Sequence, residues 1–481
     1  MLFVPTSFAL LRCVTSARGS AALSLACMLL VGGPSAVADD WNTGPGGNSR
    51  RTSLSKELGP SSPSILWEGS LAAQVAQQAV TEGNTVVMAR MTSLSDTQGG
   101  TTIIAQNLTT GAERWSRQLP VDFPVTDWRS RVSAIRDGRV FATRAGNTNM
   151  SYLYALDAED GHTLWRSEAL VDESSTESVV FHSSGDPIVG NFSSLTRINA
   201  LDGTTVWSVS RTCPTSNGCE AAVHNDSIYI WEASAAGPRV TAFAATDGAR
   251  QYSTPGIGGG FIQQLGVMVG PDGTVYAPRT QNNPITDFFV AFTDTGSGFD
   301  EKWRVPMGYV PFASHGVGPD GSVYTYAPTR EILRLDPSDG HVLNMSEPIV
   351  SDFHQPRIAI GSGGTIYFTN GGFSGGRLYS FDADLTPRWS VPVPNVNVGG
   401  PALGENGVLI VCGVGTDVRA FFTEPAPPPC PCDWNTDMAL NSQDFFDFLA
   451  AFFAGNADFN DDSMTNSQDF FDFLSCFFTG C

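Results

Sequence analysis

The chain has 481 residues, room for one large domain and a small one, and 41% of them are hydrophobic, so a full core can be buried. Only 16% are charged, whereas Gly (50) and Pro (30) are plentiful, which is typical of many short strands joined by turns. The net charge of −21 argues against nucleic acid and anionic membrane surfaces as partners and favours cations or cationic partners.

Residues 1–38 are predicted to be a signal peptide. Arg12 and Arg18 precede an apolar run, Ala21–Val31, and Ala36–Ala38 fits a small-residue cleavage site. A transmembrane anchor is the alternative, but the run is short for crossing a bilayer, and no later stretch is long and apolar enough to do so. We therefore expect cleavage near Ala38 and a mature chain that is secreted, periplasmic or held at the cell surface.

From residue 39 to residue 423 one unit recurs. Each copy is an alternating strand, a turn centred on Asp-Gly or Thr-Gly, and a strand that ends near a tryptophan, as in Leu153–Trp165 and Leu195–Trp207. In the clearest copies the Gly lies four residues before the tryptophan and supplies the positive φ that a tight hairpin needs. Several units contain a second hairpin. Two hairpins make a four-stranded sheet, and a ring of such sheets is a β-propeller.

The anchor positions predict the number of blades. They are Trp67, Trp115, Trp165, Trp207, Tyr252, Trp303, Asn344 and Trp389. Trp67 has no preceding unit. The last unit has strands at Pro401–Leu403, Gly407–Val414 and Asp417–Phe422 but no closing tryptophan strand. We therefore expect Ser64–Leu71 to supply the outer strand of the last blade, which removes an exposed edge. Eight anchors predict eight blades, and seven is the alternative if one degenerate unit is an excursion.

The units resemble the tryptophan-docking, PQQ-like repeats of quinoprotein-type propellers, through a pattern carried by Ala155, Asp157, Gly161 and Trp165. The resemblance implies an all-β propeller in a family that includes quinone-cofactor alcohol dehydrogenases and non-catalytic scaffolds. A dehydrogenase of this family is expected to hold its cofactor against two adjacent cysteines, and this chain has no Cys-Cys pair. We therefore expect no quinone cofactor.

No other catalytic constellation stands out in the propeller. The string Gly372–Gly376 matches Gly-x-Ser-x-Gly, but a predicted strand follows it where a nucleophile elbow needs a helix. His162 and His341 follow turn glycines and are expected to be exposed turn residues instead of metal ligands. The acid before the turn, as at Asp157 and Asp336, could suggest paired carboxylates for glycoside cleavage. Its strict place in the repeat favours turn capping.

Export implies an oxidising compartment, so cysteines can pair. The mature chain has Cys213, Cys219, Cys412, Cys430, Cys432, Cys476 and Cys481. Cys213 and Cys219 enclose a short loop and are the first predicted disulfide. Cys430 or Cys432 could bridge one of the last two cysteines, because so small a module needs support. Alternatively, Cys481 is left free for attachment.

The composition changes after Phe422. Residues 424–431 form a Pro-rich linker, and residues 432–481 contain a duplication in which Asn441–Phe448 and Asn466–Phe473 both read NSQDFFDF. Oxygen donors precede each copy at loop positions 1, 3, 5, 9 and 12, and position 7 offers a carbonyl, the spacing with which a 12-residue loop wraps calcium. The predicted ligands are Asp433, Asn435, Asp437, Ala439, Asn441 and Asp444, and then Asp458, Asn460, Asp462, Met464, Asn466 and Asp469.

The C-terminal module resembles a type I dockerin, in which two loop–helix units bind calcium and pack symmetrically. The repeated NSQDFFDF and the terminal Gly-Cys resemble the GC-type dockerin tails of secreted bacterial proteins. Loop position 6, where the family has Gly at positive φ, is Met438 or Ser463, and a non-Gly residue there costs roughly 1 kcal/mol. We expect up to two calcium ions, bound weakly.

Ten phenylalanines on the two predicted helices are more than the helices can hide against each other. We expect Phe445, Phe446, Phe470 and Phe471 to form a surface for a protein partner or cell-surface component, the alternative being contact with the propeller. The whole chain is therefore predicted to be an exported, non-catalytic propeller scaffold held in place by a calcium-ordered tail. A quinone-dependent oxidoreductase or a polysaccharide-acting protein is the alternative, and the propeller's ligand is not identified.

Overall fold

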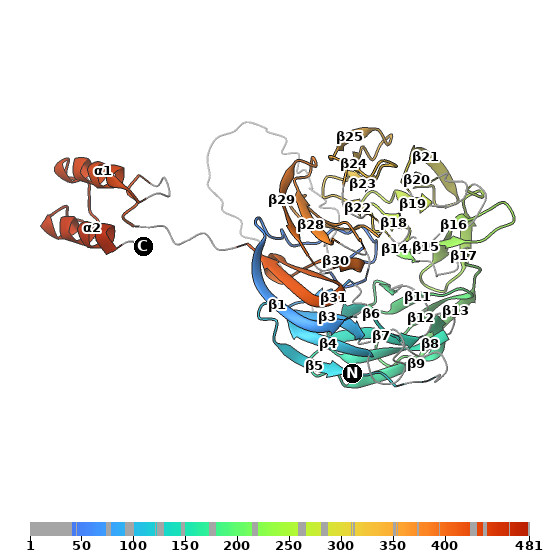
Figure 1. Ribbon diagram of the computed structural model, residues 1–481. Helices are drawn as coiled ribbons and strands as arrows, with labels where there is room; N and C mark the ends of the chain where they lie inside the picture. Colours follow the sequence, from blue (N-terminus) through green and yellow to red (C-terminus); the bar gives the residue numbers. More distant parts are fainter. Residues whose placement is uncertain are drawn as a thin grey trace, which may run out of the picture. The chain divides into compact units, whose positions relative to one another are not determined.

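The computed structural model describes residues 41–479 apart from 45, 74–77, 92–100, 121, 123–128, 146–149, 173–178, 214–219, 258–265, 280–286, 309, 311–312, 350–352, 354, 373–374, 394, 424–430, 436–439 and 461. Eight antiparallel sheets form the blades of a β-propeller, and two helices form a C-terminal module (Figure 1). The prediction of an eight-bladed all-β domain is confirmed. The predicted signal peptide lies outside the described residues. No helix in the described part of the chain is long and apolar enough to cross a membrane.

The first four blades each contain four strands. Blade 1 contains β2 (Val80–Glu82), β3 (Thr85–Met91), β4 (Thr101–Asn107) and β5 (Glu113–Arg117). Blade 2 contains β6 (Arg129–Arg136), β7 (Arg139–Ala145), β8 (Met150–Asp157) and β9 (Thr163–Asp172). Blade 3 contains β10 (Val180–Phe181), β11 (Pro187–Gly190), β12 (Ser194–Ile198) and β13 (Thr205–Ser210). Blade 4 contains β14 (Ala222–His224), β15 (Ser227–Glu232), β16 (Arg239–Ala244) and β17 (Arg250–Ser253).

Blades 5 to 7 repeat this order, and blade 8 joins the two ends of the propeller. Blade 5 contains β18 (Met268–Val269), β19 (Val275–Arg279), β20 (Phe288–Asp294) and β21 (Phe299–Pro306). Blade 6 contains β22 (Gly316–Val317), β23 (Val323–Tyr326), β24 (Ile332–Leu335) and β25 (Val342–Met345). Blade 7 contains β26 (Arg357–Ile360), β27 (Ile366–Thr369), β28 (Arg377–Phe381) and β29 (Pro387–Pro392). Blade 8 contains β30 (Asn395–Gly404), a short 3-10 turn (Glu405–Gly407), β31 (Val408–Phe422) and β1 (Ser64–Ala73).

The ring closes by pairing β1 with β31. Ser64 lies opposite Phe422, and Trp67 lies opposite Ala420, so the N-terminal strand supplies the outer strand of blade 8 as expected. One detail differs from the expectation. The two strands predicted at Gly407–Val414 and Asp417–Phe422 are the single strand β31, because no Pro and no Asp-Gly or Asn-Gly pair interrupts the sequence between them.

Most blades are locked to the next by an anchor tryptophan. Gly161 turns the β8–β9 hairpin at a φ of +76°, and a Cβ placed on it would come within 2.6 Å of the Trp115 ring from the preceding blade. The indole N–H of Trp115 also donates to the carbonyl of Ala158 (3.0 Å). The same donation to the next blade's turn, at 2.8–3.2 Å, is made by Trp67 to Leu108, Trp165 to Ala200, Trp207 to Ala245 and Trp303 to Pro337. The repeated glycine is therefore needed for both the turn and the packing of the ring.

Three of the eight locks are built differently. At the closure of the ring, Trp389 donates its indole N–H to the carbonyl of Ser61, which precedes β1 (3.1 Å). At the tyrosine anchor, Tyr252 and its neighbour Tyr229 donate their hydroxyls to the two carboxylate oxygens of Asp294 in the next blade (2.7 and 2.6 Å). At the asparagine anchor, Asn344 has no ring, and the glycine position of the next turn is occupied by Leu385, which is 3% exposed at a φ of +68°. The loss of the large residue and the loss of the glycine thus occur at the same blade junction.

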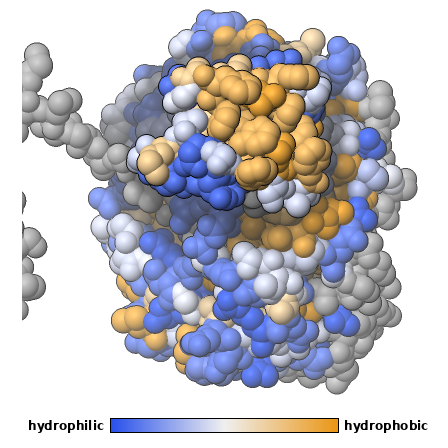
Figure 2. Space-filling model, turned by 90° about the vertical axis from the view of Figure 1, so that its left-hand side faces the viewer, coloured by the Kyte–Doolittle hydropathy of each residue, from blue (hydrophilic) through white to orange (hydrophobic). Residues whose placement is uncertain are grey.

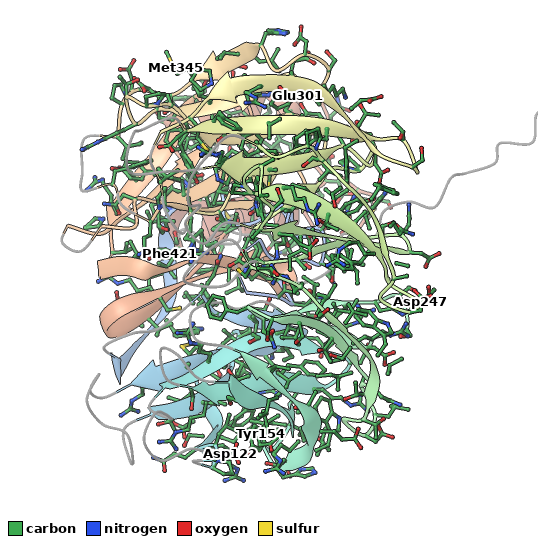
Figure 3. All side chains as sticks on the ribbon, turned by 90° about the vertical axis from the view of Figure 1, so that its right-hand side faces the viewer. Asp122, Tyr154, Asp247, Glu301, Met345 and Phe421 are labelled. Atoms are coloured by element: carbon green, nitrogen blue, oxygen red, sulfur yellow. A yellow bond between two sulfur atoms is a disulfide. The ribbon has the colours of Figure 1, made fainter. Side chains whose placement is uncertain are left out.

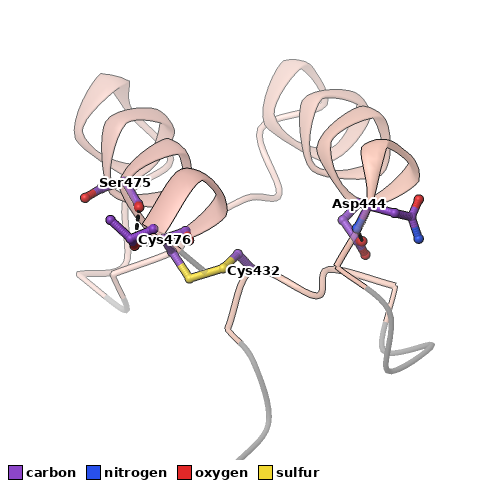
Figure 4. Close-up of a disulfide and its surroundings, with 6 residues drawn as sticks. Cys432, Asp444, Ser475 and Cys476 are labelled. Carbon is purple, nitrogen blue, oxygen red and sulfur yellow. Dashed lines mark hydrogen bonds between the residues drawn. A yellow bond between two sulfur atoms is a disulfide. The ribbon is translucent and has the colours of Figure 1, made fainter. Parts of the chain in front are cut away.

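The C-terminal module consists of α1 (Ser442–Phe453) and α2 (Ser467–Thr479), whose rings form its core. Phe448 and Phe473 are fully buried and stack with their centroids 3.9 Å apart, and the Trp434 ring meets Phe448 edge-on at 5.0 Å. Cys432 and Cys476 form a disulfide that ties the start of the module to α2 (Figure 4). Cys430 and Cys481, the alternative partners in this disulfide, lie outside the described residues, as does Cys219 of the predicted loop disulfide.

Candidate calcium-binding and partner site

The two helices of the C-terminal module begin in the same way, so the 25-residue duplication in the sequence is also a duplication of hydrogen bonds. Asn441 accepts from the backbone N–H of Gln443 (2.7 Å), and Asp444 accepts from the backbone N–H of Asn441 (2.8 Å), which is a capping box. The equivalent bonds in the second half join Gln468 to Asn466 (2.8 Å) and Asn466 to Asp469 (2.7 Å). Predicted loop positions 9 and 12 are thereby held together at each helix start.

The position-12 carboxylates lie in the interior of the module. Asp444 and Asp469 are both 0% exposed, and besides the capping bond each accepts a backbone N–H from position 3 of its loop, Asn435 (3.3 Å) or Asn460 (3.2 Å). Asp469 also accepts from Phe459 (2.8 Å). These carboxylates therefore join position 3 of each loop to position 9 through the protein's own hydrogen bonds.

The backbone donors keep both carboxylates ionised. Burial disfavours the charged form of Asp444, but the N–H groups of Asn441, Asn435 and Trp434 outweigh burial and hold the pKa of this carboxyl below its usual value. For Asp469 the N–H of Asn466 is the largest influence, and with those of Asn460 and Phe459 it lowers the pKa against the effect of burial. Because both folded pKa values lie below the unfolded value of roughly 4, this stabilisation is present at neutral pH and is lost as the pH falls through the folded pKa values.

The backbone of the second loop positions the side-chain oxygens of its predicted ligands. Asp458 at position 1 accepts the backbone N–H groups of Asp462 (3.0 Å) and Ser463 (2.7 Å), so the chain curls around this carboxylate. Ser463 at position 6 has a φ of +72°, a left-handed bend that favours Gly. Asn460 accepts from Asp462 (3.1 Å), and Asp462 accepts from Met464 (2.9 Å). Positions 1, 3 and 5 are therefore arranged by the loop's own backbone.

The donor chemistry fits calcium, a hard cation that takes carboxylate, amide and carbonyl oxygens. In the second loop, Asp458, Asn460 and Asp462 would supply side-chain oxygens and Met464 its carbonyl. In the first loop, Asp433 and Asn435 are half-buried, whereas the predicted ligands Asp437 and Ala439, together with Met438, lie outside the described residues. The ion would cross-link the loop, and Asp469 would hold the loop against the helix from within.

The helices present two kinds of phenylalanine. Phe445 and Phe470, two of the four residues predicted for a partner surface, are half-buried and pack in the module's core. The other two, Phe446 and Phe471, are 60% and 62% exposed. More exposed still are Phe453 (82%) and Phe478 (79%), which the predicted surface did not include. Figure 2 shows apolar side chains covering much of the face of the module.

Helical spacing could have separated the two kinds. Phe445, Phe448 and Phe452 recur at three and four residues and therefore lie on one stripe of α1, which faces the core. Phe446 and Phe453 are seven residues apart and lie on a different stripe, which is exposed. The exposed face on each helix also carries a Gln–Asp hydrogen bond of 2.8 Å, from Gln443 to Asp447 and from Gln468 to Asp472.

The side chains of the turn acids and histidines of the propeller form hydrogen bonds within their own turns. Asp157 and Asp336 accept backbone N–H groups two residues on (2.8 and 2.7 Å), which is turn capping. His162 and His341 are more than half exposed and contact the turn acids Asp160 and Asp339. Each of these turns brings two Asp and one His together with their possible metal-ligand atoms within 4.8 Å of one another. The described part of the chain contains no other such group of three.

A further polar cluster links blades 1 and 2. Asp122 accepts from the Tyr154 hydroxyl (2.6 Å) and the Arg166 guanidinium (3.3 Å), and Figure 3 shows Asp122 and Tyr154 side by side. Burial, reinforced by Asp122, raises the pKa of the Tyr154 hydroxyl above its ordinary value, so this phenol stays protonated and donating. In the Gly372–Gly376 string, Ser374 lies outside the described residues, and the segment after it is strand β28.

Comparisons with known proteins agree with the blade architecture. The sequence profile of the PQQ-like family described as outer membrane protein assembly factor BamB matches residues 100–346. Quinohemoprotein alcohol dehydrogenase from Comamonas testosteroni is similar over 81% of this chain and 81% of its own, with a TM-score of 0.53 and 13% identity. BamB from Moraxella catarrhalis is similar over 76% of this chain and 98% of its own, with a TM-score of 0.50 and 14% identity.

A designed protein also shares the architecture. The computationally designed Ika8 protein is similar over 74% of this chain and 100% of its own, with a TM-score of 0.54 and 11% identity. At such identities a likeness shows the fold alone. None of the curated proteins matches the sequence.

Proposed function

We propose a function from the premise that the chain belongs to the PQQ-like propeller family described as outer membrane protein assembly factor BamB, whose profile matches more than half of it. Its structural neighbours include both BamB and an alcohol dehydrogenase, so the fold decides neither a scaffold nor an enzyme. We infer that the protein is an exported, non-catalytic scaffold, attached to a protein partner or cell-surface component through its C-terminal module.

The duplicated, exposed phenylalanine face of the module carries this proposal. Phe446, Phe453, Phe471 and Phe478 are each at least 60% exposed, although a folded module gains nothing from leaving such rings in water. The last 52 residues contain nine Asp and no Lys, Arg or Glu. A fitting partner therefore has apolar pockets rimmed by Lys or Arg, because such a rim complements the acidic module.

Calcium would order this face. When bound, the ion supplies positive charge that lets the acidic oxygens of one loop lie close together. Asp458, Asn460 and Asp462 would hold it in the second loop, while Asp469 keeps the loop joined to α2. The two halves of the module have the same hydrogen bonds, which supports up to two calcium ions. At the second loop, the positive φ of Ser463 is strained, which supports weak binding.

The non-catalytic part of the proposal is supported by the cysteines. A quinone seat of the dehydrogenase type needs two adjacent cysteines, and the sequence has none. The described propeller cysteines belong to different blades, with Cys213 after β13 and Cys412 on β31. The residues present therefore do not fit that cofactor. A quinone-dependent oxidoreductase remains the competing function because one neighbour is such an enzyme.

The proposal is tested by two experiments on the mature protein. In the first, washed envelopes of the source cells are incubated with the protein, with calcium or with a chelator. We expect calcium-dependent retention that falls at least tenfold in a Phe453→Ser, Phe478→Ser double variant. The matched control is Leu201→Ser, which removes a 74% exposed side chain from the propeller and should change nothing.

The second experiment addresses the competing enzyme. The protein is incubated with pyrroloquinoline quinone and calcium, and alcohol-dependent dye reduction is measured. Dye reduction at a rate proportional to the bound quinone would overturn the scaffold proposal. If retention of the protein on the envelopes is unchanged by the chelator and by the phenylalanine substitutions, the attachment role of the module is overturned.

A further inference from the structure

The segment Trp41–Ser55, here called the axial segment, contacts the innermost strands of seven blades. Six of these strands each donate one backbone N–H to a carbonyl of the axial segment. The donor–acceptor pairs are Thr81 to Trp41 (2.7 Å), Ile135 to Asn42 (2.8 Å), Val223 to Ser49 (2.7 Å), Val269 to Arg50 (3.0 Å), Val317 to Thr52 (2.8 Å) and Ile360 to Ser53 (2.7 Å). On the seventh strand, β10, the N–H of Phe181 donates to the Ser49 hydroxyl (3.0 Å).

These bonds follow the order of the blades. Trp41 meets blade 1, Asn42 meets blade 2, and successive residues meet the later blades up to Ser53 at blade 7. The innermost strand of a blade has no neighbour on its axial side, so its N–H groups there need another partner. The axial segment supplies that partner and therefore winds around the propeller axis.

Buried side chains also fix the axial segment in place. Trp41 is fully buried, and Gly47 approaches it so closely that a Cβ on Gly47 would lie 2.7 Å from the ring. Arg51 is 2% exposed, donates from Nε to the carbonyl of Ala221 (2.6 Å) and pairs with Glu220 (3.4 Å).

The backbone of the axial segment is strained. Arg51 and Ser53 have φ values of +58° and +56°, conformations that L-residues adopt at a cost of about 1 kcal/mol each. The segment forms isolated bridges, such as Thr43 with Ala134 and Leu54 with Ile360, and contains no named strand. Bonds within the segment, such as Asn42 to Gly47 (3.0 Å) and Ser53 to Gly46 (2.8 Å), and the bonds to the blades together hold this shape.

We propose that this ring of inward N–H donors is a peptide-binding site, with the axial segment as its resident ligand. The class of ligand is a Gly- and Ser-containing peptide that folds back on itself between Thr43 and Gly47 and carries one buried Arg. It offers a carbonyl to each of six blades and a hydroxyl to a seventh. A peptide of the same sequence enters the site when the resident segment is weakened. This site is separate from the C-terminal module, so the proposal stands or falls independently of the attachment function.

The test compares two glycines with the same φ of +71°. Gly47→Ala places a methyl group against the Trp41 ring, whereas Gly138→Ala, in the β6–β7 turn, meets nothing within 4 Å. Backbone strain is therefore matched, and only Gly47→Ala disturbs the axial segment. In the full mature chain, we expect hydrogen exchange at the amides of Val223, Val269 and Val317 to rise at least tenfold in Gly47→Ala and to be unchanged in Gly138→Ala.

Peptide uptake completes the test. A fluorescent peptide of residues 41–55 should bind the Gly47→Ala protein, measured by anisotropy, at least tenfold more tightly than it binds the wild type or Gly138→Ala, and a scrambled peptide should not bind. If Gly47→Ala does not fold, Arg51→Met replaces it, because it removes the bond to Ala221 and the ion pair with Glu220. Unchanged exchange, absence of peptide binding, or equal binding of the scrambled peptide would overturn the proposal.

Discussion

The propeller and the C-terminal module are both built by repetition, yet their repeated aromatic residues have opposite environments. Trp115, Trp165 and Trp303 are 6–7% exposed, and each donates its indole N–H to the next blade. Phe453 and Phe478 of the module are 82% and 79% exposed. A ring of eight units gives every unit a neighbour, so its repeated residues are used in packing. Two units cannot close a ring, and each keeps an outer face with exposed rings.

The largest effect should come from breaking a propeller lock. Trp165→Ala removes a buried ring and its hydrogen bond to Ala200, and we expect the free energy of unfolding to fall by about 3–5 kcal/mol. Denaturant unfolding followed by circular dichroism measures it, with Leu201→Ala as the exposed control. A loss below about 1 kcal/mol would mean that the blades do not depend on these locks.

The next effect concerns the staple of the module. Replacing Cys432 and Cys476 together by Ser should destabilise the module by about 2–4 kcal/mol, because a small core depends on its cross-link. Hydrogen exchange of the α1 and α2 amides in the intact protein reports this loss locally. Ser475→Ala, at the neighbouring exposed position, is the control. If the double variant retains the exchange protection of the wild type, the module is held by its ring stack alone.

A third prediction converts an irregular blade junction into a regular one. Asn344→Trp alone should destabilise, because Leu385 occupies the glycine position against which a tryptophan would pack. Leu385→Gly alone relieves a positive φ but leaves a void. Together they should recreate the lock, with a favourable coupling of about 1–3 kcal/mol in a double-mutant cycle of unfolding energies. Additive effects would show that this junction is not equivalent to the others.

The smallest effect is expected at the second calcium loop. Ser463→Gly should stabilise the module or tighten its calcium binding by about 1 kcal/mol, roughly fivefold in affinity, because Gly accepts the φ of +72° without strain. Ser463→Ala is the matched control, since it removes the hydroxyl and keeps the strain. Equal gains in both variants would trace the effect to the hydroxyl and not to the backbone.

Much of the propeller could be predicted because its rules are local. A Gly four residues before a Trp indicates both the hairpin turn and the contact with the preceding blade. Trp67, which has no repeat unit before it, correctly indicated that the N-terminal strand closes the ring. The prediction divided residues 407–422 into two strands, whereas Val408–Phe422 is the single strand β31. The role of Trp41–Ser55 was not predictable, since its bonds reach as far as Ile360 and involve backbone groups, which carry no side-chain signature.

The module was predictable in outline and less so in detail. The duplicated spacing predicted two loop–helix units, and the structure contains two helices with matching caps. To divide the phenylalanines into core and surface, one must know which side of the helix each ring lies on. Phe445 and Phe446 are adjacent in sequence but lie on different sides. The pairing of Cys432 with Cys476 depends on the packing of the module and could not be chosen over its alternatives from sequence.

We propose that calcium orders the C-terminal module and not the propeller. Isothermal titration of the mature protein with calcium, combined with hydrogen exchange, tests it most directly. We predict saturable binding that weakens at least tenfold in an Asp458→Asn, Asp462→Asn variant and is unchanged in Asp160→Asn, which alters an acidic turn of the propeller. Calcium should slow exchange in α1 and α2 and leave the blades unaffected. Absence of binding at millimolar calcium, or binding that survives the loop substitutions, would contradict the account.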